Sequence, residues 1–452
     1  MKKSKKWIGL LLGVVSLFQI NILPVQAEAY WPEGPTIAGD SAIVMEASTG
    51  TVLYEKNSHQ ELYPASITKI MTALLAVENS SLDEQVTFSA NAVYKTEGSG
   101  IWRDVDEVMT MKECLYALML ESANECAYAI AEHVGGNYDT FVQMMNDKAT
   151  ELGCQNTHFN NPHGLPDEIH HTSAYDMALI SRAALQNETF RLITSTKRYT
   201  IPATNKHAEE TYLSNHHKLV NNWKGDSSYL YEGCIGGKTG YTTAANSTLV
   251  TFAERDGMTL ICVVMNEESP NHYVDTTNLL NYCFENFQLW NVAENENNYT
   301  SDKTENKIFA NEESFLSIDP QGFVVLPKAA AFTDAVPEIK EDTKAEDKVG
   351  TIQYTYADRN VGGADIKING AKVSQFPFEK EDVSDNEKKV VNINTKYILI
   401  GILVVILLVG IGFGIYHFAD NFYLIRYKLM SKRQKGFKEI KQRKQRRRKR
   451  WF

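Results

Sequence analysis

The chain has 452 residues, of which 43% are hydrophobic and 23% are charged, and its formal net charge is −10. This ordinary globular composition excludes disorder along the whole chain and a membrane protein with many spans. Six cysteines also exclude a small scaffold held together by disulfides. The charge is uneven, because residues 1–27 carry +4 and residues 419–452 carry +12, which leaves −26 between them. An acidic body between two basic ends indicates an association with membranes.

The N-terminal segment is typical of a secretory signal. Four lysines come before an apolar run over residues 7–22, and Val25-Gln26-Ala27 matches the small-residue pattern of a signal-peptidase site. We therefore predict a signal peptide over residues 1–27, with an uncleaved anchor as the alternative. Export would place the six cysteines in an oxidising environment, where disulfides can form. Several of them lie in apolar periodic runs, which is equally typical of buried free thiols.

The body begins with a predicted hairpin followed by helices. Residues 41–56 read as two strands around the turn Ser48-Thr49-Gly50. A helix is expected after Pro64, because apolar residues recur there at helical spacing: Ile67, Ile70, Met71, Leu74 and Leu75. Residues 110–190 are expected to be mostly helical.

Strands return in the second half of this unit. They are expected at residues 230–235, 247–254 and 258–265, and the last two are joined by the turn Arg255-Asp256-Gly257. A helix over residues 272–287 closes the unit. Because strands occur at both ends with helices between them, we predict an α+β fold in which one antiparallel sheet is flanked by helices.

The composition changes after this unit. A polar stretch follows Trp290, residues 351–356 alternate with period two, and residues 397–418 carry no charge. A helix of 22 residues is long enough to span a hydrocarbon core of ~30 Å, and the basic residues after it would stay cytoplasmic. The predicted organisation is 1–27 signal peptide, 28–290 α+β domain, 291–306 linker, 307–372 small all-β domain, 373–396 charged stalk, 397–418 transmembrane helix and 419–452 basic cytoplasmic tail.

This topology predicts a single-pass protein of the cell membrane, after signal cleavage, with its body outside. The alternative for the basic tail is a nucleic-acid-binding arm. Because the adjacent span already explains the charge, we expect the tail to contact anionic lipid and expect no nucleic-acid partner.

The first motif with chemical potential is Ser66-Ile67-Thr68-Lys69. A separation of three residues places both side chains on one face of a helix. Serine becomes a good nucleophile only when a base takes its proton, and lysine can do so only if its pKa falls well below ~10.4. For an isolated match, the alternative is a helix-capping serine beside a solvated lysine.

Two further motifs follow along the chain. Ser122-Ala123-Asn124 lies between two apolar helical runs, where the alternative is a simple helix cap. Lys238-Thr239-Gly240 follows a strand, and Tyr241 comes next. The glycine would let a ligand approach the backbone, and the lysine and threonine offer a cation and a hydroxyl for a carboxylate. The alternative there is a turn with a solvated lysine.

Rival patterns are weaker. A phosphate-binding loop ending in Lys238-Thr239 would need glycine at the position of Glu232. Four histidines suggest zinc, but no H-E-x-x-H motif is present, so we expect them to cap or fill loops: His158, His163, His170 and His171. We expect Glu121 and Glu125, on either side of Ser122-Ala123-Asn124, to be exposed carboxylates at helix ends.

In this order, the three motifs resemble those of the penicillin-recognising serine enzymes. The run from Tyr63 to Thr72 is similar to the low-molecular-weight penicillin-binding proteins that act as D-alanyl-D-alanine carboxypeptidases. Further resemblances are Phe141–Asn146, Asn156–Phe159, Pro162–Leu165 and Thr172–Asp176. The resemblance covers about Trp31 to Phe287 and continues more weakly through the β module. The sequence departs from the family pattern at Ala123, at Glu125-Cys126 and at Ile235-Gly236.

The resemblance implies a serine transpeptidase/β-lactamase-like fold and a carboxypeptidase that removes the terminal D-alanine of peptidoglycan stem peptides. Ser66 would form an acyl-enzyme, also with β-lactam antibiotics, and Lys69 would be its base. Ser122 would relay a proton. Substrate binding would involve Asn124, Lys238, Thr239, Gly240 and Tyr241. The resemblance implies no metal and no organic cofactor.

Two alternatives stay open. A β-lactamase would use the same acylation chemistry, and a membrane-anchored β-lactam sensor would bind the drug and signal across the membrane. The basic tail is too short for a folded output domain, which disfavours the sensor.

Overall fold

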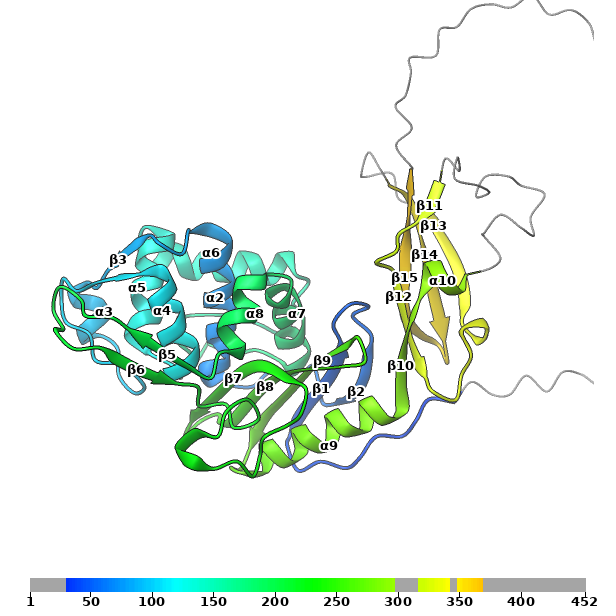
Figure 1. Cartoon of the computed structure of the whole chain (residues 1–452), viewed down its shortest axis with the longest axis horizontal. Helices are drawn as coiled ribbons and strands as arrows, with labels where there is room; N and C mark the ends of the chain where they lie inside the picture. The colour runs from blue at the N-terminus through cyan, green and yellow to red at the C-terminus, as the bar shows by residue number, and fades with distance from the viewer. Residues whose placement is uncertain (1–29, 297–315, 342–347, 369–452) are drawn as a thin grey trace, which may run out of the picture. The chain divides into compact units, whose positions relative to one another are not determined.

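The computed structural model describes residues 30–296, 316–341 and 348–368 (Figure 1). The predicted signal peptide, stalk, transmembrane helix and tail lie outside these residues, as does most of the predicted linker. None of the helices in the described ranges is long and apolar enough to cross a membrane.

One antiparallel sheet joins the N-terminal hairpin to the late strands, which confirms the predicted α+β arrangement. Its strand order is β2-β1-β9-β8-β7. The central pairing is between β1 (Ser41–Glu46) and β9 (Met258–Glu267), from opposite ends of the segment. β2 (Val52–Lys56) forms one edge, while β8 (Asn246–Arg255) separates β9 from the other edge, β7 (Cys234–Thr242).

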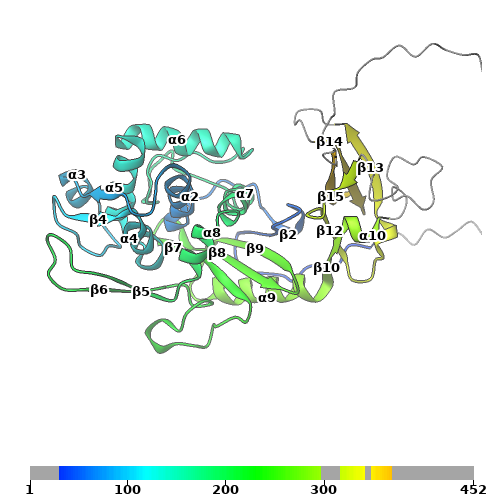
Figure 2. The same ribbon diagram turned by 45° about the horizontal axis from the view of Figure 1, so that its top comes forward.

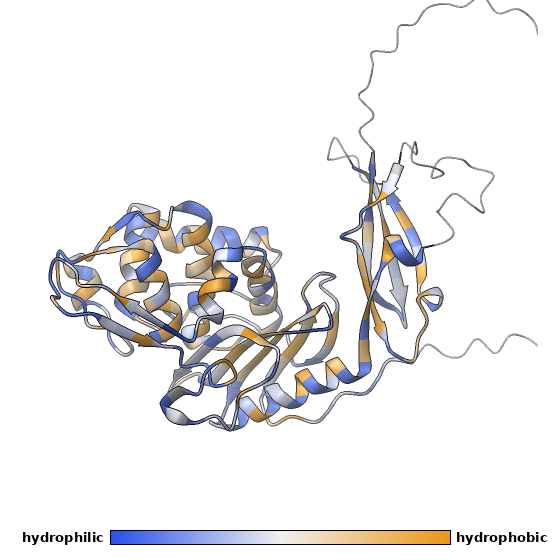
Figure 3. Cartoon of the chain, in the orientation of Figure 1, coloured by the Kyte–Doolittle hydropathy of each residue, from blue (hydrophilic) through white to orange (hydrophobic). Residues whose placement is uncertain are grey.

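Helices cover both faces of this sheet (Figures 1 and 2). In β1, Ile43 and Met45 pack into the core beneath the larger helical layer, whereas Ala42 and Val44 pack on the opposite side with α9 (Asn271–Asn286). Alternate residues of a strand point to opposite faces, so a strand covered twice needs apolar residues at every position. The helices of the larger layer are α2 (Lys69–Asn79), α5 (Asn124–Gly135), α6 (Tyr138–Glu151), α7 (Ala174–Leu185) and α8 (Glu188–Ser195). Figure 3 shows hydrophobic residues along these strands and helices.

Shorter elements connect the helices. They are α3 (Ala90–Tyr94), α4 (Met111–Tyr116), the hairpin β3 (Gln85–Thr87) with β4 (Val108–Thr110), the hairpin β5 (Arg198–Ile201) with β6 (Thr211–Ser214), and the 3-10 turn η3 (Trp223–Gly225). The strand expected at residues 230–235 is wrong in position, because β7 begins only at Cys234. Gly233 has a φ of +89°, and a Cβ there would lie 2.6 Å from the Glu254 carbonyl oxygen, so the chain turns before the strand starts.

A second antiparallel sheet follows. Its main order is β10-β12-β15-β14-β13, and β11 also pairs with β15. In β14 the buried side chains alternate as Ile352, Tyr354 and Tyr356, in line with the period-two pattern of the sequence. The elements are β10 (Phe287–Asn291), α10 (Val292–Asn295), β11 (Leu316–Ile318), β12 (Phe323–Pro327), η4 (Phe332–Asp334), β13 (Val336–Glu341), β14 (Lys348–Tyr356) and β15 (Arg359–Ile368).

The polar stretch after Trp290 begins as ordered structure. β10 pairs with β12, and Glu296 is 3% exposed and accepts a hydrogen bond from the Tyr354 hydroxyl. Composition alone suggested a linker there, because Asn and Glu dominate it. The tyrosine hydroxyl supplies the partner that a buried carboxylate needs.

Candidate active site

Ser66 lies in a short 3-10 helix, η1 (Ala65–Thr68), that leads directly into α2. Ala65 has a φ of +51°, in the left-handed region that costs an L-residue about 1 kcal/mol or more. Gly164 packs on this turn, because a Cβ there would lie 1.8 Å from the Ala65 carbonyl oxygen. A Cβ at Gly240 would lie 2.8 Å from the Ser66 nitrogen. The two glycines therefore let two other backbone segments pack closely against the turn that carries the serine.

Lys69 is fully buried and reaches back to the serine. Its Nζ donates to Ser66 Oγ at 3.1 Å, to Asn124 Oδ1 at 2.7 Å and to the His163 carbonyl oxygen at 2.6 Å. Burial, and next the positive charge of Lys238, hold the pKa of Lys69 well below its usual value. The alternative of a solvated lysine is therefore wrong, and the amine is placed to take the serine proton.

The Ser122-Ala123-Asn124 motif turns the chain between two helices. A π-helix, η2 (Ala117–Glu121), ends at Ser122, which has φ +61° and ψ +31°. The Ser122 hydroxyl is buried and has no hydrogen-bond partner within the described part of the chain. Asn124 opens α5 and donates from Nδ2 to the Glu97 carbonyl oxygen at 2.5 Å, while its Oδ1 accepts from Lys69. The motif thus brings a fixed amide to the lysine, and it leaves the Ser122 hydroxyl without a partner among the described residues.

Lys238 is a second buried lysine, with 1% of its surface exposed, on the edge strand β7. Burial lowers its pKa to about 7, and the negative charge of Glu121 opposes that effect. Its Nζ donates to the Thr239 carbonyl oxygen at 2.9 Å. Thr239 is half-buried and Tyr241 is 67% exposed. The backbone of β7 passes close to the serine at Gly240, where a Cβ would lie 2.8 Å from the Ser66 nitrogen. The phosphate-loop alternative is wrong, because these residues belong to a strand.

His163 and His170 belong to a loop that packs against the segment of Ser66 to Lys69. The Thr68 hydroxyl and His170 Nε2 lie 3.0 Å apart, and His170 Nδ1 accepts from the Asn160 N–H. Burial lowers the pKa of both His163 and His170 to about 3, so both rings are neutral at pH 7. The Thr72 hydroxyl also donates to the Pro162 carbonyl oxygen at 2.6 Å. These contacts fix the loop whose His163 carbonyl receives the Lys69 amine.

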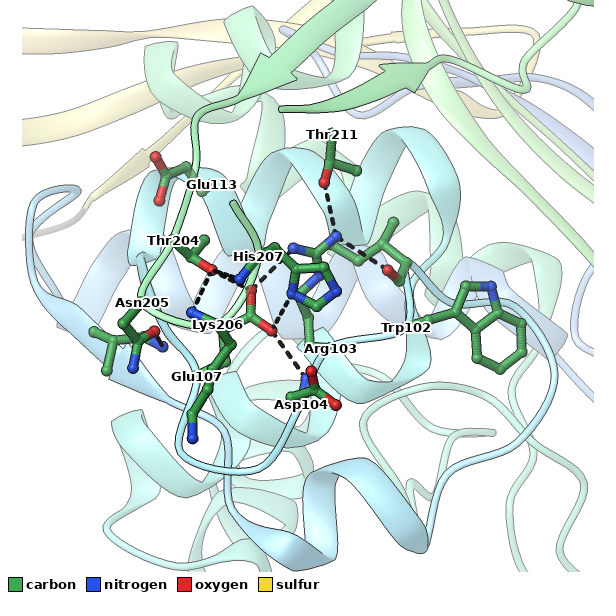
Figure 4. A network of polar contacts seen from close by, with 12 residues as sticks. Trp102, Arg103, Asp104, Glu107, Glu113, Thr204, Asn205, Lys206, His207 and Thr211 are labelled. Carbon is green, nitrogen blue, oxygen red and sulfur yellow. Dashed lines mark hydrogen bonds and ion pairs between the residues drawn. The ribbon is translucent and has the colours of Figure 1, made fainter. Parts of the chain in front are cut away.

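Within the described ranges, one group of three side chains has the spacing of metal ligands: Asp104, Glu107 and His207 (Figure 4). Glu107 is fully buried, but its oxygens are already engaged. Arg103 Nη1 and the Thr204 hydroxyl donate to Oε1 at 3.0 and 2.8 Å, and Oε2 lies 3.0 Å from His207 Nδ1. The guanidinium supplies the compensating positive charge, so the cluster fits a structural ion pair better than a cation site.

The prediction that Glu121 and Glu125 are exposed is wrong. Glu125 is only 6% exposed, and its Oε1 accepts the N–H groups of Ile101 and Trp102 at 2.6 and 2.8 Å. Glu121 accepts the Ser214 N–H at 2.6 Å and pairs with His216 at 2.8 Å. Both helix ends are covered by other segments of the chain, which the local sequence did not reveal.

The residues that sequence reasoning missed act mainly through their backbones. The 95–107 loop supplies the carbonyl of Glu97 to the Asn124 side chain and that of Ser99 to the Asn124 N–H, at 2.8 Å. The available signal was the glycine-rich run Gly98-Ser99-Gly100, because a Cβ at Gly100 would lie 2.6 Å from Glu125 Oε2.

The six cysteines are all free.

Comparison with known proteins agrees with this geometry. The family model described as D-alanyl-D-alanine carboxypeptidase matches residues 28–269, which is more than half of the chain. The chain belongs to this family. It is therefore a serine peptidase of the hydrolase class, and its main fold is that of the penicillin-binding serine peptidases.

Several relatives cover much of the chain. It is 32% identical to the D-alanyl-D-alanine carboxypeptidase DacF of Bacillus subtilis over 354 residues, which is 76% of this chain and 85% of that protein. It is 34% identical to a D-alanyl-D-alanine carboxypeptidase of Streptomyces sp. (strain K15), covering 55% of this chain and 88% of that one.

Solved structures show the same fold. The Streptomyces K15 DD-transpeptidase is 33% identical and superposes with a TM-score of 0.52 over 56% of this chain and all of its own. The carboxypeptidase DacD from Francisella tularensis superposes with a TM-score of 0.57 over 75% of this chain and 95% of its own. At 23% identity, this second match supports the fold alone.

Proposed function

We propose that this protein is a serine-type D-alanyl-D-alanine carboxypeptidase that removes the terminal D-alanine from peptidoglycan stem pentapeptides through an acyl-enzyme on Ser66. The observation that carries the proposal is the buried amine of Lys69, 3.1 Å from Ser66 Oγ, with its pKa lowered by burial and by a second buried lysine. A family member with this pair intact has both the nucleophile and its base.

In the proposed reaction, the Ser66 hydroxyl attacks the carbonyl between the two terminal D-alanines and its proton passes to Lys69. The backbone N–H groups of Ser66 and Tyr241 would donate hydrogen bonds to the resulting oxyanion. Each such donor stabilises the transition state by about 3 kcal/mol. Collapse breaks the peptide bond, and the leaving amine takes a proton through Ser122. Water then attacks the ester and releases the shortened peptide.

Substrate binding would rest on the edge strand. The terminal carboxylate fits the cation of Lys238 and the hydroxyl of Thr239, since a charged partner strengthens each hydrogen bond. Gly240 lets the substrate backbone approach, and the Asn124 amide would hold the substrate carbonyl while keeping Lys69 in place. A β-lactam offers a similar carboxylate and a strained amide, so the same residues would be acylated by it.

The location of the enzyme is also a proposal. We place the body outside the cell, anchored by residues 397–418 with a basic cytoplasmic tail, as a single-pass membrane protein whose signal is removed. Support comes from the sequence pattern and from peptidoglycan being an extracellular substrate. The sheet of β10 to β15 would form a small domain of its own between the catalytic domain and the stalk. Protease added to intact cells should then remove the body and leave the tail.

The proposed function is tested by comparing the wild type with two variants, each of which lacks one serine. The wild type should release D-alanine from a pentapeptide and gain one penicillin mass on the peptide that contains Ser66, with or without EDTA. Ser66→Ala should do neither. Ser81→Ala is the matched control, because Ser81 is an exposed serine just beyond the far end of the same helix α2, and it should behave like the wild type. An adduct on another residue, or penicillin turnover without D-alanine release, would refute the proposal.

A further inference from the structure

The turn at Ser122 needs support from its surroundings. A serine at φ +61° following a π-helix is in a conformation that persists only where neighbouring structure fixes it. Its hydroxyl has no partner in the described part of the chain, so its own side chain does not hold the turn. The support must come from the residues on either side.

Glu125 provides a direct contact from this turn to the 95–107 loop. Its Oε1 accepts two successive N–H groups of the loop, those of Ile101 and Trp102. A carboxylate that accepts two backbone donors in a buried setting forms strong, charge-assisted hydrogen bonds. The same loop returns two carbonyl oxygens to Asn124, so Glu125 and Asn124 hold it from adjacent positions of one helix start.

The far end of the loop is fixed as well. Arg103 and Glu107 form a buried ion pair, and Arg103 Nη2 donates to the Thr211 hydroxyl at the start of β6 at 2.9 Å (Figure 4). From the end of β6 the chain returns to the turn, where Ser214 donates to Glu121. The contacts therefore connect the two sides of the Ser122 turn through the 95–107 loop and β6, with one carboxylate at each side of the motif.

We propose that Glu125 is a positioning residue of the reaction: by clamping the 95–107 loop it fixes Asn124, and through the Asn124 oxygen it fixes the amine of Lys69 opposite Ser66. Glu121 clamps the other side of the same turn. The inference rests on the proposed function and deepens it. Glu125 touches neither the nucleophile nor the substrate carboxylate site.

The charge of Glu125 adds a measurable consequence. The positive charge of Lys238 lowers the pKa of Lys69, and the negative charge of Glu125 raises it. Cys126 also faces Lys69, but burial raises the pKa of its thiol well above the usual value, so it carries no charge near neutral pH. His163 and His170 also face this region but are neutral at pH 7. Lys69 works as a base when neutral, so activity is lost as pH falls through its pKa. Removing the negative charge lowers that pKa further and moves the acid limb to lower pH.

The test compares Glu125→Ala, which removes the clamp, with Glu125→Gln, which keeps an oxygen of the same reach but no charge. Penicillin acylation and kcat should fall ~10- to 100-fold in the alanine variant with little change in KM, because small displacements of reacting groups cost about that much. The glutamine variant should recover most of the rate, and its acid limb should lie at lower pH than that of the wild type.

Glu113→Ala is the matched control. Glu113 accepts the Thr110 N–H at 2.7 Å at the start of α4, so its loss should reduce thermal stability but leave the rate and the acid limb unchanged. If Glu125→Ala does not fold, the acid limb of Glu125→Gln decides alone. Acylation of Glu125→Ala within twofold of the wild type, or an unmoved acid limb in Glu125→Gln, would overturn the inference. A wild type that neither acylates nor releases D-alanine would instead refute the proposed function.

Discussion

The pKa of about 7 at Lys238 predicts a loss of substrate binding just above neutral pH. A buried lysine with this pKa is half charged at pH 7 and only ~1% charged at pH 9, from the titration of a single group. A hydrogen bond to a carboxylate is worth ~1.5–3 kcal/mol when the partner is charged and ~0.5–1.5 kcal/mol when it is neutral. The difference of about 1–1.5 kcal/mol corresponds to a ~5- to 12-fold weaker interaction.

Because half of the lysine is already neutral at pH 7, we expect kcat/KM for a peptide with a free terminal carboxylate to fall about three- to sixfold between pH 7 and pH 9. This ratio reports the ionisation of the free enzyme, where the pKa of Lys238 is lowered. The same peptide with an amidated terminus should bind weakly at every pH, with no such decline. The assay is D-alanine release at fixed ionic strength across this range.

Lys238→Arg is the informative variant, because a guanidinium keeps its charge throughout this range. The arginine variant should be less active than the wild type at pH 7, since the planar guanidinium does not fit a buried position that holds a lysine amine. Its kcat/KM should nevertheless stay flat up to pH 9. A wild-type profile that is flat up to pH 9, or an arginine variant that declines like the wild type, would show that Lys238 does not titrate at the carboxylate site.

Three further changes test the site and its frame. Lys69→Arg should abolish penicillin acylation, because arginine cannot deprotonate; acylation at near wild-type speed would remove Lys69 from the role of base. Gly240→Ala should slow acylation more than ~100-fold and destabilise the fold by ~1–3 kcal/mol, because the new Cβ would lie 2.3 Å from Thr248 Oγ1; chemical denaturation and adduct formation measure the two effects. Glu267 is 4% exposed, and burial followed by the charge of Asp275 raises its pKa to about 8. The folded state therefore keeps a proton that the unfolded state loses, so this stability is fully present below about pH 4.5 and is lost as pH rises to about 8. In Glu267→Gln this decline should disappear, and identical pH profiles of Tm for both proteins would contradict the shift.

The sheet could be predicted because most of its strands have a recognisable local sequence pattern. The segments that became β1, β8 and β9 are apolar runs bounded by turn residues, and antiparallel pairing of the two ends is the simplest way to cover them. β7 was predicted too early in the sequence, because two successive glycines, Gly236 and Gly237, weaken the strand pattern where β7 runs. Both have φ values near +145° and lie against Thr194 and His217, so packing rather than propensity keeps them in the strand.

The side chains that we propose for catalysis and binding were chosen from the sequence, since each belongs to a short motif. Their surroundings could not be predicted from it. Lys69 is held by a carbonyl of His163, and Asn124 by a carbonyl of Glu97, and a backbone oxygen leaves no signature in the residue type. The burial of Glu125 depends on the 95–107 loop folding over it, a contact between segments more than twenty residues apart. Composition therefore suggested an exposed charge where the fold places a buried one.

In the proposed reaction, the two buried lysines need opposite protonation states, and their surroundings favour them. Lys69 must be neutral to accept a proton, while Lys238 must be charged to bind a carboxylate. Burial acts on both in the same direction, and the charge of Lys238 lowers the pKa of Lys69 further. Glu121 opposes the effect at Lys238, and a bound carboxylate would do so more strongly. Substrate binding itself would then keep Lys238 charged, and that charge would keep Lys69 neutral, which couples recognition of the terminal carboxylate to activation of the serine.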